Sequence, residues 1–164
     1  LIRAFTYLLL KKYIMTETGN FGYLGYNFQV KLLNLIIIDK SFAHSILDVV
    51  DPKYFDNQYF KLIVQIIKEY YEKYQSVPSF ETLEQLTHLE VSSEMAKKCV
   101  IDMLKEVKDS SFEDHLFIKE KSIKFCKQQE LKKAIRKVEK IMEKGEFESY
   151  DKCEIGRASC RERV

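Results

Sequence analysis

Residues that interrupt helices are scarce in this chain of 164 residues, which has five glycines, two prolines and no tryptophan. Such a composition excludes a collagen-like chain or a glycine- and proline-rich linker. Hydrophobic residues make up 46% of the sequence and charged residues 32%. This balance is typical of a globular protein and not of a disordered one. A single domain of this length buries a sizeable core.

Motifs that bind nucleotides are also missing. The sequence contains no Gly-x4-Gly-Lys-[Ser/Thr] loop of the kind that holds phosphates. Gly19, Gly22 and Gly25 are spaced by three, but neither a Lys-Ser pair nor a strand follows them. We interpret the segment that contains them as a mobile, extended arm. We expect no ATP or Mg²⁺ to bind within these residues.

No sequence pattern indicates a catalytic or metal site. The histidines are isolated from the cysteines and from one another: His44, His88 and His115. The cysteines have neither paired nor metal-ligand spacing, which predicts reduced thiols in the cytoplasm: Cys99, Cys126, Cys153 and Cys160. Adjacent helical residues point to different faces, so Asp114 and His115 do not form an acid–base pair. We therefore assign no catalytic, cofactor-binding or metal-binding residue.

Both ends of the chain differ from the rest. Residues 1–14 contain no methionine, and Met15 is a plausible native start. The apolar run from Phe5 to Leu10 is too short to span a bilayer, and we expect no membrane association. The tail from Glu154 resembles translated vector sequence. We therefore divide the chain into a non-native or flexible segment (1–26), a helical head (27–109), a long helix (110–153) and a vector-derived tail (154–164).

Apolar residues recur at helical spacing in every remaining segment, which predicts an all-α fold. Asp51-Pro52 is a helix start, because proline at the first helical position loses no hydrogen bond, and Val77-Pro78-Ser79 ends one helix and starts another with Ser79 as its cap. A buried strand at Leu35–Ile38 is the alternative for one segment. The expected helices cover about 27–38, 41–50 (capped by Ser41), 57–74, a stretch after Ser79, a stretch from Ser92 or Ser93 to 108, and 112–144.

The helix over about 57–74 shows the clearest periodicity and should lie in the core. We expect Phe60, Ile63 and Ile67 to be buried. The tyrosines at the same spacing are better explained as core residues than as a base-stacking surface: Tyr59, Tyr70, Tyr71 and Tyr74. In the helix that follows Ser93, the predicted apolar stripe consists of Met95, Cys99, Met103 and Val107.

The last predicted helix is the longest, and its C-terminal half is cleanly amphipathic. Its apolar stripe consists of Leu131, Ile135, Val138 and Met142. A helix of this length reaches about 45 Å, which a small head cannot cover. We therefore expect the stripe to be an interface between copies of the chain.

Acidic and basic residues are unevenly distributed along the chain. Residues 39–113 carry 9 basic and 14 acidic side chains, whereas residues 114–144 carry 10 basic and 5 acidic ones. The plain interpretation is a solvated helix whose lysine stems cover its apolar flank. The alternative is a helical nucleic-acid-binding module that contacts phosphates through its cations: Lys119, Lys121, Lys124, Lys127, Lys132, Lys133, Arg136 and Lys137.

The order of these features resembles the N-terminal domain of DnaB-like hexameric replicative DNA helicases, closest to those of T-even-type phages. The resemblance covers about residues 27–153. It is carried by Leu-Ile-Ile-Ile-Asp39, the Tyr54-Phe55 turn, Tyr70-x3-Tyr74-x2-Val77-Pro78-Ser79 and Glu113-Asp114-His115.

The resemblance implies a helical head followed by a helical hairpin, of which the long helix is the first arm. In such helicases the hairpins pair between subunits into a collar on which primase docks, and ATP and Mg²⁺ bind in a separate motor domain. The resemblance therefore implies self-assembly, primase and a helicase loader as partners, and a bacterial host cytoplasm as location. Lys124, Lys127 and Arg136 are the expected contacts with a partner or nucleic acid.

Overall fold

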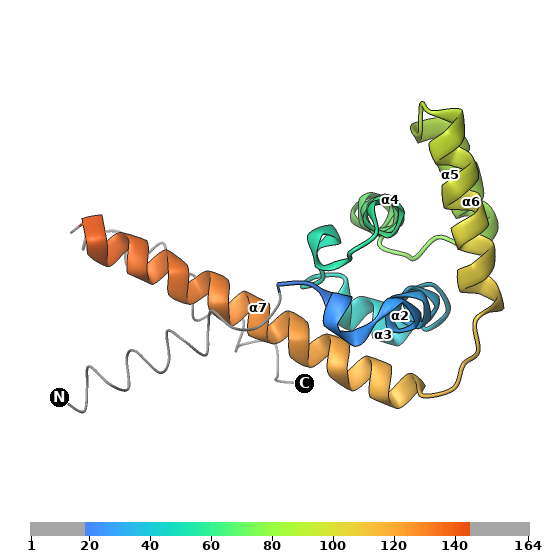
Figure 1. The fold of residues 1–164 in the computed structure, drawn as a ribbon. Coiled ribbons are helices and arrows are strands. Elements are labelled where there is room, and N and C mark those ends of the chain that lie inside the picture. Colours follow the sequence, from blue (N-terminus) through green and yellow to red (C-terminus); the bar gives the residue numbers. More distant parts are fainter. Residues whose placement is uncertain (1–18, 145–164) are drawn as a thin grey trace. The chain divides into compact units, whose positions relative to one another are not determined.

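The computed structural model describes residues 19–144, shown in colour in Figure 1. This part of the chain contains six α-helices, two 3₁₀ helices and no strand. The predicted all-α fold is confirmed, and the alternative strand at Leu35–Ile38 is wrong because those residues are helical. The described residues fall into two units, 19–126 and 127–144.

The elements follow one another with short connections. In chain order they are η1 (Phe21–Leu24), α2 (Tyr26–Ile38), α3 (Lys40–Ile46), η2 (Pro52–Tyr54), α4 (Gln58–Tyr74), α5 (Phe80–Glu90), α6 (Glu94–Asp109) and α7 (His115–Lys144).

Helix α2 is the centre of the first unit, and nine of its thirteen residues are buried. Two of the nine are polar, and each has partners from other segments. Asn34 donates its side-chain N–H to the carbonyl of Val107 in α6, at 2.6 Å. The side-chain oxygen of Gln29 accepts a hydrogen bond from the backbone N–H of Asp56, at 2.9 Å. The buried amides therefore each have a hydrogen-bond partner and tie α2 to two other segments.

Helix α4 packs its apolar face into the core as predicted, and Phe60, Ile63 and Ile67 are buried. The residue before it, Asn57, caps it by accepting a hydrogen bond from the N–H of Tyr59. The predicted core role of the tyrosines is wrong for Tyr74, which lies exposed near the C-terminal end.

Helices α5 and α6 lie side by side and are joined by a short turn (Figure 1). Ser79 and Ser93 cap them, as the sequence predicts. The predicted stripe of α6 is wrong at Met95, whose side chain is 71% exposed. Cys99 and Met103 are half-buried, and the fully buried residues of the helix are Val100, Leu104 and Val107, so the prediction is confirmed at Val107.

The glycine-spaced segment is not an extended arm. Its residue Phe21 is fully buried, with ring centroids 4.5 Å from Phe125 and 5.3 Å from Phe55. Gly25 ends η1 at a φ of +88°, a conformation that side chains other than glycine rarely adopt. This part of the predicted flexible segment therefore belongs to the core.

Helix α3 differs from its prediction at both ends. Its cap is Asp39, whose carboxylate accepts a hydrogen bond from the N–H of Phe42 at 3.0 Å, and not Ser41. The helix ends at Ile46, because the N–H groups of Val49 and Val50 both bond back to the carbonyl of Ile46 and close a turn.

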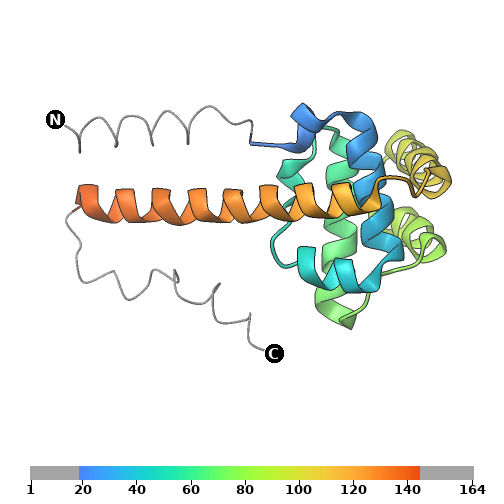
Figure 2. The same ribbon diagram turned by 90° about the horizontal axis from the view of Figure 1, so that it is seen from below.

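Helix α7 is a single α-helix of 30 residues, visible as such in Figure 2. It begins at His115 and not at Phe112, because Asp114 has a φ of +62°. Its buried residues Ile118, Phe125 and Cys126 belong to the core of the first unit, which therefore extends past the predicted head boundary at residue 109. The predictions for residues 1–14 and for the tail lie outside the described residues.

The packing of α4 leads to a stability prediction. Ile63→Ala should lower the free energy of unfolding by about 2–5 kcal/mol, because it removes buried methyl groups and leaves a cavity. The matched control is Lys61→Ala on the exposed face of the same helix, expected to change stability by less than about 0.5 kcal/mol. Urea unfolding measures both. Equal effects of the two substitutions would contradict the orientation of α4.

Candidate interaction surfaces

The predicted apolar stripe lies on the part of α7 that belongs to the second unit. Leu131, Ile135, Val138 and Met142 are spaced by four, three and four residues and therefore share one side of the helix. The side chains of Leu131 and Met142 are 61% and 59% exposed, and the other two are half-buried. An apolar row that includes two such exposed side chains is a candidate protein interface.

The predicted cationic contacts do not share one side of α7. Lys124, Lys127 and Arg136 are all exposed. An α-helix turns about 100° per residue, so the nine steps from Lys127 to Arg136 place these two on opposite sides. The prediction grouped these three residues by their charge and not by the side of the helix on which they lie.

Arg136 shares a face with three other cations, of which Lys133 and Lys137 are among the predicted phosphate contacts and Lys140 is not. These are Lys133, three residues before it, Lys137, which follows it directly, and Lys140, four residues after it; all three are exposed. We call Lys133, Arg136, Lys137 and Lys140 the basic face of α7. Helical periodicity, applied to the charges as well as to the apolar residues, finds it in the sequence.

One predicted phosphate contact, Lys119, has a structural role. Its ammonium group forms an ion pair with Asp39, and its nitrogen lies 5.7 Å from the centroid of the Phe42 ring. The hydrogen bond from Lys119, together with that from the N–H of Phe42, lowers the pKa of the Asp39 carboxyl below its usual value. This contact joins the start of α3 to α7 within the first unit.

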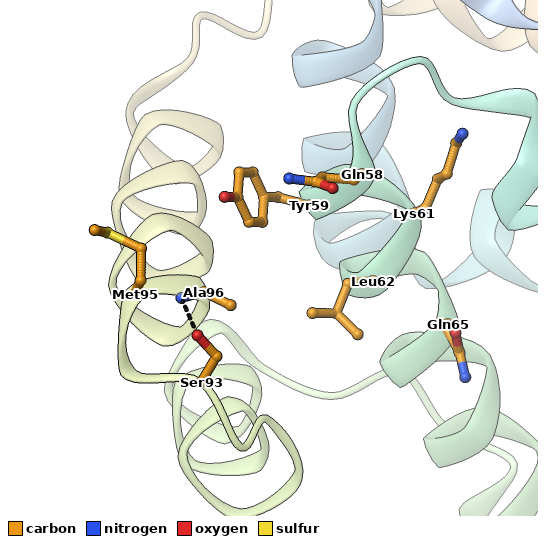
Figure 3. A pocket seen from close by; sticks show the side chains of 8 residues that line it. All are labelled: Gln58, Tyr59, Lys61, Leu62, Gln65, Ser93, Met95 and Ala96. Carbon is orange, nitrogen blue, oxygen red and sulfur yellow. Dashed lines mark hydrogen bonds between the residues drawn. The ribbon is translucent and has the colours of Figure 1, made fainter.

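A groove of about 390 Å³ lies between the N-terminal ends of α4 and α6 (Figure 3). In Figure 3, Tyr59 and Leu62 point from α4 toward α6. A hydrogen bond with Cys99 raises the pKa of Tyr59. The residues that line the groove are Gln58, Tyr59, Lys61, Leu62, Gln65, Ser93, Met95 and Ala96. The sequence did not predict it, because it depends on how two separate helices meet.

Two of the three isolated histidines, His44 and His115, contact aromatic side chains. His44 forms a hydrogen bond with the hydroxyl of Tyr71, and His115 stacks on Phe112 with ring centroids 5.2 Å apart. Cys99 and Cys126 are free thiols. Between residues 19 and 144, no three His, Cys, Asp or Glu side chains are grouped to hold a metal ion. In that same range, no helix has both the length and the apolar character needed to cross a membrane.

Comparisons with known proteins found no relative: no family model, no curated protein and no solved structure matches this chain. Its function is therefore inferred from its residues, its geometry and the resemblance that its sequence order carries.

The Asp39–Lys119 pair leads to a pH prediction. Because the pKa of Asp39 is lowered on folding, its contribution to stability should be present above its unfolded pKa of about 3.9 and be lost as the pH falls through the folded value. Asp39→Asn keeps a capping side chain but removes the charge. The stability difference between wild type and Asp39→Asn should therefore shrink from neutral to acid pH.

Urea unfolding at several pH values between about 7 and 3 measures this difference. The control is Glu90→Gln, which removes an exposed carboxylate at the end of α5. It should show little such dependence. A difference for Asp39→Asn that stays constant with pH would mean that the pair does not stabilise the fold through its charge.

Proposed function

We propose that this chain is the N-terminal assembly and primase-interaction domain of a DnaB-like replicative DNA helicase, closest to those of T-even-type phages. The order of its motifs supports the proposal, and two of them act as helix starts. Asp51 caps η2 with Pro52 as its first residue, and Ser79 caps α5 directly after Pro78. The all-α fold and a C-terminal helix of 30 residues are what such a domain requires.

The exposed stripe of α7 is the observation that carries the proposal. Leu131 and Met142 present apolar surface to water on a helix that is about 45 Å long. Covering this surface is favourable by about 25 cal/mol per Å² of apolar area. A second helical arm and the hairpin of a neighbouring copy would cover it, and the result would be the collar of a ring.

In this proposal the chain contributes no chemistry of its own. ATP and Mg²⁺ bind in a motor domain outside these residues, and that domain also makes the main contacts with DNA. The chain assembles with copies of itself and binds primase and a helicase loader, in the cytoplasm of the bacterial host. Because Lys127 and Arg136 lie on opposite sides of α7, a primase molecule docked on one side would contact only one of them.

The gene itself provides the most direct test. In the native gene, the coding sequence downstream of this domain should encode a Gly-x4-Gly-Lys-[Ser/Thr] motif within about 300 codons, a distance set by the size of one motor domain. Sequencing the native locus checks this. An in-frame stop codon directly after the long helix, or a downstream domain without the motif, would rule out the helicase assignment.

Self-association provides the second test. Sedimentation velocity of the chain should show an average mass that rises with concentration, because pairing of the stripes buries apolar surface. Leu131→Gln together with Met142→Gln should abolish this rise. The control replaces two exposed residues outside the stripe, Glu130→Gln with Glu143→Gln, and should still associate.

The variants separate two kinds of failure. If wild type and both variants sediment as the same monomer, the stripe is not an assembly surface. If the control loses association as well, charge and not apolar contact holds the copies together. Circular dichroism confirms that the variants keep their helix content.

A further inference from the structure

The basic face of α7 places four exposed cations on one side of the helix in the described part of the second unit. Lys133, Arg136, Lys137 and Lys140 follow the spacing i, i+3, i+4 and i+7, so they lie within about 100° of one another around the helix. They extend over about 10 Å along its axis. All four side chains are exposed.

The charges on this face are all of one sign. No carboxylate lies between the four cations on their face, and the nearest two, Glu130 and Glu143, lie at its edges. Lys133 is paired with Glu130 at 2.6 Å. Lys133 and Lys137, like Arg136 and Lys140, are four residues apart and repel each other. A face that served only solubility would carry both signs interspersed, whereas a polyanion would relieve this repulsion.

The position of the basic face argues against a lipid surface as its ligand. It lies opposite the apolar stripe, which a membrane-surface helix would insert into the bilayer. Residues at the borders of an inserted face meet the lipid headgroups. In α7 these borders carry Lys127 and Lys132 but none of the four cations of the basic face, which would therefore point away from the bilayer. Nucleic-acid phosphates, in contrast, require only the basic face.

We propose that the basic face of α7 binds the phosphate backbone of nucleic acid without sequence preference. Phosphates along one strand rise about 3.4 Å per nucleotide, so a face about 10 Å long spans roughly three of them. No aromatic residue occurs on this face, so it offers no ring on which bases could stack. This activity goes beyond the proposed assembly role and does not rest on it, because it uses the opposite side of the helix.

The test measures fluorescence anisotropy of a labelled oligo(dT) and a labelled duplex, each about 30 nucleotides long, titrated with the full chain at about 50 and 200 mM sodium chloride. The basic-face variant is Arg136→Gln with Lys137→Gln and Lys140→Gln. The control, Lys40→Gln with Lys61→Gln and Lys98→Gln, removes three exposed lysines of the first unit. Both variants lower the net charge by the same amount.

The wild-type chain should bind at low salt and weaken as salt rises. The basic-face variant should bind about tenfold or more weakly, and its slope of log affinity against log salt should be smaller by about 2, since each lost phosphate contact removes about 0.7–0.9. The control should stay within about twofold of wild type. Comparison of oligo(dT) with the duplex shows which form of nucleic acid the face prefers.

Three results would overturn the proposal. One is the absence of binding at low salt, and another is an equal loss of binding in both variants, which would reflect net charge alone. The third is unchanged oligonucleotide binding with lost binding to phosphatidylserine-containing vesicles, which would assign the face to membranes. The basic-face variant retains the apolar stripe, so it should still self-associate in sedimentation velocity. A failure of phosphate binding is therefore distinguishable from a failure of the assembly proposal. Circular dichroism confirms that it is folded.

Discussion

Helix α2 is apolar on most of its sides, and the neighbouring elements of the first unit pack against it and cover it. Apolar side chains surround the helix, so η1, α3 and α6 all pack against it. Burial of its two amides would cost free energy unless each found a partner. Asn34 finds one in α6, and Gln29 finds one in the backbone of Asp56. These polar contacts specify which surface of each neighbour faces α2, whereas apolar contact alone would allow several.

Helix α7 changes its role along its length. Its first turns contribute Ile118 and Phe125 to the core, and Lys119 anchors them to Asp39. Residues 127–144 instead carry an apolar stripe and a basic face on opposite sides. The two proposed activities, assembly through the stripe and phosphate binding through the basic face, therefore need not compete for the same surface. A single amphipathic helix can serve both because its period separates the two kinds of residue.

The fold class, most helix starts and the inward face of α4 were predictable from the sequence alone. These depend on neighbours in the chain: Asp51 and Ser79 cap the turns that follow them, and the period of 3.6 residues placed Ile63 inward. The apolar stripe of α7 was predictable for the same reason. The basic face was equally accessible from helical periodicity, although reasoning from charge alone grouped Arg136 with Lys127.

Contacts between segments that are distant in the sequence depend on how the whole chain packs and were not predictable from local pattern. Phe21 is buried because Phe55 and Phe125 come together around it, and nothing in its own glycine-spaced segment indicates that. Asp39 pairs with Lys119, which is eighty residues away in the sequence. The groove between α4 and α6 likewise exists only where the two helices meet. Local periodicity specifies which side of a helix is apolar, but the partner that covers it depends on how the whole chain packs.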